Sequence, residues 1–222
     1  MKVLILGASR GIGLEFVRQY RAAGDIVIAT ARDAEGLTRI EQLGAKPLKL
    51  DVTDAASVSG LGWQLDGEKV DLAIYVAGVM SHGGAKEPPP RDEFDQVMRT
   101  NVWGAMQAIP LVAPLVEAAH GCFAFVSSQM GHIAGADNSY GWVYRASKAA
   151  LNMAAVAAQP DYPHATFVVL SPGWVQTDMG GEKAPLPVEA SVEWLRRTID
   201  ELPAKHRHVP FLDYDGTAFK GW

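Results

Sequence analysis

Short, continuous runs of apolar residues recur along the whole chain, and helix-like segments separate them. A strand with one face in water alternates apolar and polar residues, whereas a strand covered on both faces is apolar throughout, as in parallel sheets. The pattern therefore predicts a parallel sheet with helices on both faces. The runs are VLIL (3–6), IVIA (26–29), KPLKL (46–50), LAIYVAG (72–78), CFAFVSS (122–128), TFVVLSP (166–172) and VPFL (209–212).

The segments between these runs carry helix signals. Residues 12–24 end in a glycine, residues 91–109 are acid-rich at their start, and residues 187–202 open with a proline. The alternation of strand and helix predicts a doubly wound α/β fold. In the last segment one helical stripe is apolar, formed by Val188, Val192, Leu195 and Ile199.

Residues 83–92, GGAKEPPPRD, are expected to form a loop, because three prolines cannot enter a helix interior or a central strand. The chain has no internal repeat and no long linker, and 222 residues suit one domain with a sizeable core. We therefore expect a single domain over residues 1–222.

The composition excludes several classes of protein. The net charge is −5 and Lys/Arg runs never exceed a pair, which argues against a nucleic-acid or anionic-membrane surface. The single cysteine, Cys122, rules out an internal disulfide and is expected to be a buried thiol. The apolar start of the chain is too short for a signal peptide, and no run approaches the roughly 18–20 apolar residues of a membrane span. We expect a soluble, cytoplasmic protein.

The first strand is followed by GASRGIG, which contains Gly7, Gly11 and Gly13. Glycines in this position permit a tight turn and a close backbone approach, and the helix that follows presents its N-terminus to a pyrophosphate. The segment therefore predicts dinucleotide binding, the alternative being a plain glycine turn.

The end of the second strand, IATARD, bears on the choice between NAD and NADP. Ala31 occupies the slot where an acid would bind the adenosine ribose, and Arg32 follows it. Arg10, in the glycine loop, can reach the same place, and two guanidiniums suit a 2′-phosphate. We favour NADP(H). In the alternative interpretation Asp33 binds the ribose, or Arg32 is merely solvated.

Two further features, Asp51 and a series of two tyrosines and a lysine, can be interpreted either as functional or as purely structural. Asp51, in KLDVTD, can accept a hydrogen bond from an adenine amino group, or it can be a turn residue beside the candidate N-cap Asp54. Tyr140, Tyr144 and Lys148 follow one another at intervals of four residues. Such neighbours on a helix often share a half-wet face with no chemical role.

Taken in order, these motifs resemble those of the short-chain dehydrogenase/reductase family, nearly from end to end. The resemblance implies a Rossmann-type, mostly parallel seven-stranded sheet in the order 3-2-1-4-5-6-7. PGWVQTDMGG and FLDYDG are further similar to the C-factor-like, carbonyl-reductase-related branch. The matching features are the glycine motif, DVTD, Asn101 in TNVWG, Ser128 in VSSQMG, Tyr144 with Lys148, and SPGWVQT (171–177).

The resemblance also implies a catalytic set. A phenol with a pKa of about 10 is a poor base near neutral pH, and a nearby ammonium lowers that pKa. Lys148 lies one helical turn after Tyr144, so Tyr144 is the expected acid–base, while Tyr140 is expected in the pocket wall. Ser128, with Ser127 as its rival, would hydrogen-bond the substrate oxygen. Lys148 would also hold the nicotinamide ribose, and Asn101, otherwise a buried helix asparagine, would support a water relay.

The remaining site residues fall into two groups. The substrate set is apolar and aromatic and suits a hydrophobic carbonyl compound, with ordinary loop packing as the alternative: Met80, His132, Trp142, Trp174 and Met179. The cofactor-binding residues that the resemblance implies are Gly7, Ser9, Arg10, Gly11, Ile12, Gly13, Arg32, Asp51, Val52, Ala77, Gly78, Tyr144, Lys148, Pro172, Val175 and Thr177.

The chain departs from the family in two places. YVAG (75–78) replaces the usual Asn-Asn-Ala-Gly, so some buried backbone hydrogen bonds must be made differently. The serine–tyrosine separation is longer than usual, and residues 131–143 are expected to form a wall of the substrate cleft. His206 and His208 lack a third ligand, and we assign no metal.

These features favour an NADPH-dependent carbonyl reductase that also works in reverse as an alcohol dehydrogenase. A dinucleotide-binding sensor or signalling protein is the alternative, favoured by YVAG. An isomerase or epimerase on the same fold is a third hypothesis, although the short segment after Thr177 leaves little room for a nucleotide-sugar substrate.

A small molecule is the expected partner, with no nucleic acid and no membrane. The family pairs subunits through the helix around Lys148, so we expect a homodimer or homotetramer.

Overall fold

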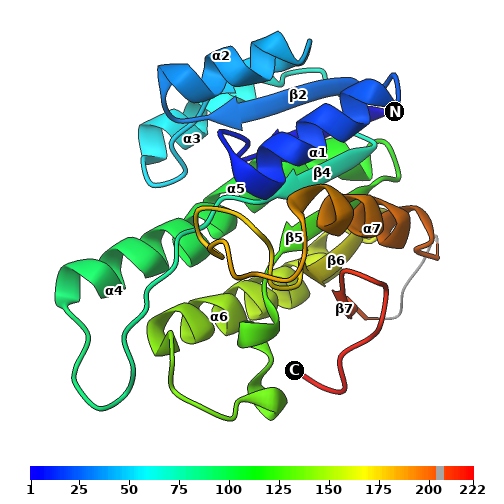
Figure 1. The fold of residues 1–222 in the computed structure, drawn as a ribbon. Coiled ribbons are helices and arrows are strands. Elements are labelled where there is room, and N and C mark those ends of the chain that lie inside the picture. Colours follow the sequence, from blue (N-terminus) through cyan, green and yellow to red (C-terminus); the bar gives the residue numbers. More distant parts are fainter. Residues whose placement is uncertain (204–207) are drawn as a thin grey trace.

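A seven-stranded parallel sheet in the order β3-β2-β1-β4-β5-β6-β7 organises the computed structural model (Figure 1). The structure describes residues 1–203 and 208–222. The register aligns Val3 of β1 with Val27 of β2 on one side and with Leu72 of β4 on the other. The predicted strand order is confirmed. The strands are β1 (Lys2–Leu6), β2 (Ile26–Ala31), β3 (Lys46–Lys49), β4 (Leu72–Tyr75), β5 (Cys122–Val126), β6 (Thr166–Ser171) and β7 (Phe211–Asp213).

Helices cover both faces of the sheet, as the continuous apolar runs predict. Alternate residues of β1 enter different cores: Val3 and Ile5 pack with α1, α2 and α7, whereas Leu4 and Leu6 pack with α3, α5 and α6. The central strand β1 is therefore buried on both sides. The helices are α1 (Gly11–Ala22), α2 (Ala34–Gln42), α3 (Ala55–Gln64), α4 (Arg91–Met98), α5 (Gly104–Glu117), α6 (Trp142–Ala158) and α7 (Val188–Asp200).

The helix predicted at 91–109 is longer than its sequence signals indicate. It runs from α4 through a π turn (Arg99–Trp103) into α5, which contains Pro110 and Pro114 and ends at Glu117. Proline costs an internal hydrogen bond. The buried apolar face of α5 continues past both prolines, at Val112, Ala113 and Val116, and this packing outweighs the cost. The expected loop 83–92 correspondingly ends at Pro90.

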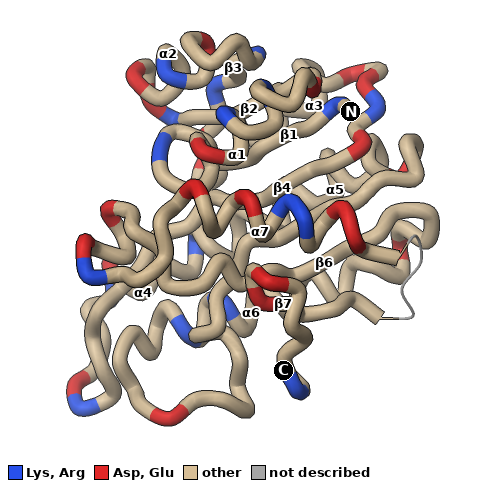
Figure 2. The backbone as a smooth tube through the Cα atoms, turned by 45° about the vertical axis from the view of Figure 1, so that its right-hand side comes forward, with Lys and Arg blue, Asp and Glu red and all other residues tan. Residues whose placement is uncertain are grey.

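Several predicted strands are too long at their carboxyl ends. LAIYVAG leaves the sheet after Tyr75, and CFAFVSS leaves it after Val126. In a doubly wound sheet this edge is where ligands bind. Positions of Lys and Arg and of Asp and Glu are scattered over many elements of the chain (Figure 2). Among the described residues, no helix combines the length and apolar character needed to cross a membrane.

Candidate active site

The glycine loop joins β1 to α1 with almost no spare volume. Gly7 has a φ of +94°, and a Cβ atom there would lie 2.6 Å from the amide nitrogen of Ala77. A Cβ on Gly13 would lie 2.2 Å from the carbonyl oxygen of Gly7. The glycines therefore allow a tight turn that leads into the N-terminus of α1, where a pyrophosphate can approach.

Two residues outside the motif anchor this loop. The Thr30 hydroxyl accepts a hydrogen bond from the amide of Gly7 at 3.0 Å. Arg39 Nε of α2 donates to the carbonyl oxygen of Ser9 at 2.9 Å. Arg39 lies outside every motif named above, and Thr30, although it lies in IATARD, was given no role there, so only the folded chain reveals that they position the loop.

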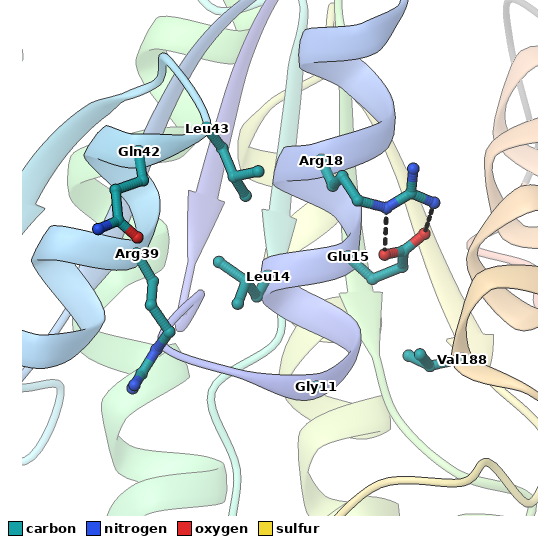
Figure 3. A pocket seen from close by; sticks show the side chains of 8 residues that line it. All are labelled: Gly11, Leu14, Glu15, Arg18, Arg39, Gln42, Leu43 and Val188. Carbon is teal, nitrogen blue, oxygen red and sulfur yellow. Dashed lines mark hydrogen bonds and ion pairs between the residues drawn. The ribbon is translucent and has the colours of Figure 1, made fainter.

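A hollow of about 380 Å³ opens beside the loop, between α1, α2 and the start of α7 (Figure 3). Leu14 and Leu43 line it between the two helices, and Arg39 and Gly11 lie at its lower end in this view. None of the four predicted catalytic residues lines it. The hollow borders the outer side of the glycine loop and is separate from the predicted catalytic residues.

The residues weighed for the choice between NAD and NADP follow β1 and β2. Asp33, the alternative ribose ligand, is the N-cap of α2 and accepts a hydrogen bond from the Gly36 amide at 2.7 Å. Arg32 is exposed. Arg10 is ion-paired with Asp178 at 2.5 Å, and both side chains are largely exposed. The carboxylate of Asp33 is thus engaged in capping, whereas both arginines face solvent.

Asp51 forms a local turn, which is one of the two interpretations made from the sequence. Its carboxylate accepts hydrogen bonds from the amide and hydroxyl of Thr53, forming a local turn. Burial raises the pKa of Asp51, but these bonds and the charge of Arg32 outweigh burial and lower it. Asp54 caps α3 by accepting from the Ala56 amide, as predicted.

Asn101 lies in the π turn and is fully buried. Its Oδ1 accepts from the amide of Val79, and its Nδ2 donates to the carbonyl oxygen of the same residue, both at 2.8 Å. The side chain thus clamps the segment that follows β4. π turns interrupt helices frequently at functional sites.

Ser147 connects Asn101 to the helix that carries the tyrosine. Its hydroxyl accepts a hydrogen bond from Asn101 Nδ2 at 2.9 Å and donates to the carbonyl oxygen of Tyr144 at 2.7 Å. Sequence reasoning missed Ser147, although its place three residues after Tyr144 was the available signal.

Tyr144 and Lys148 lie on α6, as predicted. Lys148 Nζ lies 5.6 Å from the centroid of the Tyr144 ring and donates to the carbonyl oxygen of Val126 at 2.9 Å. Burial lowers the pKa of Lys148 to about 8. Burial also raises the pKa of Tyr144 to about 12, while a hydrogen bond with Ser128 acts in the lowering direction. The expected lowering of the phenol pKa by Lys148 is therefore absent here, because desolvation dominates.

The two candidate serines after β5 face different partners. Ser127 is buried and donates to Oδ1 of Asn152 at 2.6 Å. A hydrogen bond with Ser128 acts to lower the pKa of Tyr144, and the Ser128 hydroxyl accepts a bond from the Met130 amide at 3.1 Å. The geometry thus places Ser128 beside the phenol and Ser127 in the packing between β5 and α6.

The YVAG segment makes its backbone bonds with the neighbouring strand. The amides of Val76 and Ala77 both donate to the carbonyl oxygen of Leu6, at 2.8 and 3.0 Å. A Cβ on Gly78 would lie 3.3 Å from Asn101 Oδ1 and 3.4 Å from Lys148 Nζ. Gly78 therefore brings the backbone next to both polar groups, where Ala77 already packs against the glycine loop.

The segment after β6 covers the glycine loop. A Cβ on Gly11 would lie 3.4 Å from Cγ2 of Thr177. Pro172 accepts a hydrogen bond from the Ser191 hydroxyl at 2.7 Å, and Val175 pairs with Leu186 in an isolated bridge. These contacts bring three predicted cofactor-binding residues to the site and fasten the segment to the start of α7.

The predicted substrate residues divide into two groups. Met80 lies near Gly141, at the start of α6, where Trp142 begins the helix. His132 packs with the rings of Phe211 and Phe219, and its Nε2 lies 3.0 Å from the carbonyl oxygen of Lys220. His132 is thus engaged with the C-terminal segment.

Trp174 and Met179 belong to the segment after β6 and are 58% and 42% exposed. Trp174 Nε1 donates to the carbonyl oxygen of Gly180 at 2.8 Å. The predicted cleft wall at 131–143 meets the β4–α4 loop, because the Gly141 amide donates to the carbonyl oxygen of Gly83.

The histidines weighed as metal ligands contribute little. His206 lies outside the described residues, and His208 is exposed. Within the ranges 1–203 and 208–222, no group of three or more His, Cys, Asp or Glu side chains is arranged to hold a metal ion.

Comparisons with known proteins agree with this geometry. The family model for short chain dehydrogenases matches residues 1–186. The C-signal protein of Myxococcus xanthus is 38% identical over 151 residues, covering 67% of this chain and 90% of that protein.

Two solved structures are similar over 100% of this chain and 99% of theirs, each at 27% identity. Carbonyl reductase Sniffer of D. melanogaster superimposes with a TM-score of 0.92. A short-chain dehydrogenase/reductase from Burkholderia multivorans with bound NADP superimposes with a TM-score of 0.91.

Proposed function

The chain belongs to the short-chain dehydrogenase/reductase family, in its C-factor and carbonyl-reductase branch, and from that premise we propose that it is an NADPH-dependent carbonyl reductase. The substrate is a small, hydrophobic carbonyl compound, or the corresponding alcohol in the oxidative direction. The observation that carries the proposal is the arrangement in which Ser128 acts on the pKa of the buried Tyr144, Lys148 lies beside the tyrosine ring, and Asn101 is tied to the same helix.

The residues around the glycine loop fit a dinucleotide. Gly7 and Gly13 let the loop pack closely on Ala77 and on itself, and Gly78 brings the backbone next to Lys148, so backbone rather than side chains would face the dinucleotide. Arg10 and Arg32 would hold the 2′-phosphate, and Asp51 the adenine amino group. When bound, the nicotinamide supplies a hydride to the carbonyl carbon.

The chain's own groups handle the proton. The neutral phenol of Tyr144 donates its proton to the carbonyl oxygen, while the Ser128 hydroxyl donates a hydrogen bond to the same oxygen and orients it. Lys148 would hold the nicotinamide ribose, and Asn101 would support a water relay that returns a proton to the tyrosine. Carbonyl, hydride and proton together give the alcohol.

Initial rates with NADPH and NADH test this function. Purified protein would be assayed against aromatic ketones, aldehydes, diketones and quinones. The proposal predicts turnover of at least one class, with a higher kcat/KM for NADPH than for NADH. Absence of turnover in folded protein that binds NADPH would contradict it.

That negative result would support a second candidate, which the similarity to the C-signal protein favours. In this alternative the chain is a dinucleotide-binding signalling protein with little turnover. A pure binder has no need of a serine and a tyrosine arranged around a reacting oxygen, so the reductase remains the first proposal.

The family resemblance also leads us to propose a single domain over residues 1–222 that assembles as a homodimer or homotetramer. Exposed apolar side chains on the outer helices support the assembly: Trp103 and Met106 lie next to or on α5, and Met153 lies on α6. Light scattering after size exclusion would measure the mass. A monomeric mass of 23.9 kDa would contradict the assembly.

A further inference from the structure

Tyr75 is the first residue of the segment that departs from the family pattern. It ends β4, is fully buried, and lies with its ring 6.5 Å from that of Phe125. Its hydroxyl donates to the carbonyl oxygen of Thr100 at 3.1 Å. A buried hydroxyl without a partner is costly, so this bond fixes where the ring and the turn meet.

The next helix leaves room for this hydroxyl. A Cβ on Gly104 would lie 2.8 Å from the Tyr75 hydroxyl and 2.9 Å from Cβ of Val52. Such distances are shorter than van der Waals contact allows. The glycine and the hydroxyl therefore fit together, and the sheet approaches the helix closely at this point.

The carbonyl that Tyr75 binds belongs to the π turn, immediately before Asn101. The Asn101 side chain in turn clamps Val79 and reaches Ser147. A rigid support at Thr100 limits how the turn can shift, and with it the backbone and amide of Asn101.

We propose that Tyr75 is a positioning residue whose hydroxyl holds the π turn and thereby places Asn101 for the proton relay. Tyr75 does not touch the reacting atoms. It takes the position of the first asparagine in the usual motif and supplies a support from the sheet to the turn. The proposal rests on the proposed reductase function for its effect on turnover.

Tyr75→Phe tests it, because this change removes the hydroxyl and keeps the ring. The matched control is Tyr20→Phe, which removes the hydroxyl of another fully buried tyrosine on α1, in the core on the other face of the sheet. Amide exchange of residues 99–104 and of Val79 would be measured by mass spectrometry or NMR. We expect faster exchange in Tyr75→Phe, by about five- to tenfold, and wild-type exchange there in the control.

Kinetics give the second readout. Tyr75→Phe should lower kcat by about five- to tenfold while KM for NADPH stays within about twofold of wild type. Unchanged exchange, or faster exchange with wild-type kcat, would overturn the proposal. Lack of turnover in the wild type would contradict the reductase function instead, and the exchange result alone would then decide whether Tyr75 holds the turn.

If Tyr75→Phe is too unstable for kinetics, a double-mutant cycle of thermal stability with Gly104→Ala provides an independent test. The added methyl group meets the Tyr75 hydroxyl, so Tyr75→Phe should relieve part of the loss of thermal stability in Gly104→Ala. We expect the melting temperature of the double variant to fall by less than the sum of the falls seen in the two single variants. Strict additivity would show that the hydroxyl does not occupy this place and would overturn the proposal.

Discussion

Lys148 Nζ lies 5.6 Å from the centroid of the Tyr144 ring and donates its hydrogen bond to the carbonyl oxygen of Val126. The two side chains are close enough for the charge to act on the ring, yet burial controls the ionisation of both. It favours the neutral lysine and the neutral phenol. A neutral phenol can donate a proton, which is what the proposed reductive direction requires of Tyr144.

The pKa of Lys148 predicts how stability depends on pH. Its folded value, about 8, lies below the unfolded value of about 10.4. Below pH 8 both states are protonated and the folded state bears the cost of a buried charge. Between pH 8 and about 10.4 the unfolded state binds more protons, so rising pH stabilises the fold.

Lys148→Met removes this dependence. We expect the melting temperature of the wild type, relative to the variant, to rise between pH 8 and 10. Differential scanning calorimetry at several pH values measures the difference. A difference that stays constant over this range would show that the lysine titrates normally in the fold.

The raised pKa of Tyr144 predicts that the rates of reduction and oxidation depend differently on pH. Reduction needs the neutral phenol and should be nearly flat across neutral pH. Oxidation needs the phenolate, so log kcat should rise with a slope near 1 between about pH 7 and 9. Steady-state assays in both directions would reveal it, and parallel profiles would argue against Tyr144 as the titrating group.

Asp178 is ion-paired with Arg10, which we propose as a ligand of the 2′-phosphate, so the carboxylate would compete with that phosphate. Because both side chains are largely exposed, their ion pair is weak. Asp178→Asn should therefore lower KM for NADPH by about two- to fivefold and leave KM for NADH unchanged. Glu182→Gln removes the same charge from an exposed position in the same segment and serves as the control. An equal effect on both cofactors would refute a role at the 2′-phosphate.

Substitution of the two neighbouring serines should have different effects: one should lower the catalytic rate and the other the thermal stability. Ser128→Ala removes the hydroxyl beside Tyr144 and should lower kcat by about 10²-fold or more. Ser127→Ala leaves the buried Asn152 without its partner and should lower the melting temperature by several degrees, about 2–4 °C per kcal/mol lost. Kinetics and thermal unfolding of both variants test this. The reverse pattern would assign the substrate oxygen to Ser127.

Much of the fold could be predicted from the sequence because its signals are local. Continuous apolar runs indicate strands covered on both faces, and the glycine loop requires a tight turn at Gly7 whatever surrounds it. The order of the strands came from the motifs taken together. The N-cap at Asp54 could also be predicted, because a capping side chain bonds an amide only two residues further along the chain.

The rest depends on contacts between residues far apart in the chain. The π turn around Asn101 and the passage of α5 through Pro110 follow from packing against the sheet, which no local pattern records. The bond from Tyr75 to Thr100 joins positions 25 residues apart. The direction of the Tyr144 pKa was missed for a similar reason, since desolvation arises only once α6 is buried.

The most direct test of the account is NADPH oxidation by Tyr144→Phe, with Tyr140→Phe measured beside it. Tyr140 lies one turn earlier, is 52% exposed, and hydrogen-bonds His82 at 2.7 Å. With a carbonyl substrate that the wild type reduces, we predict a loss of about 10²- to 10⁴-fold in kcat for Tyr144→Phe, with NADPH binding retained. Tyr140→Phe should keep measurable turnover. Wild-type kcat in Tyr144→Phe would contradict the proposed proton donor and the mechanism built on it.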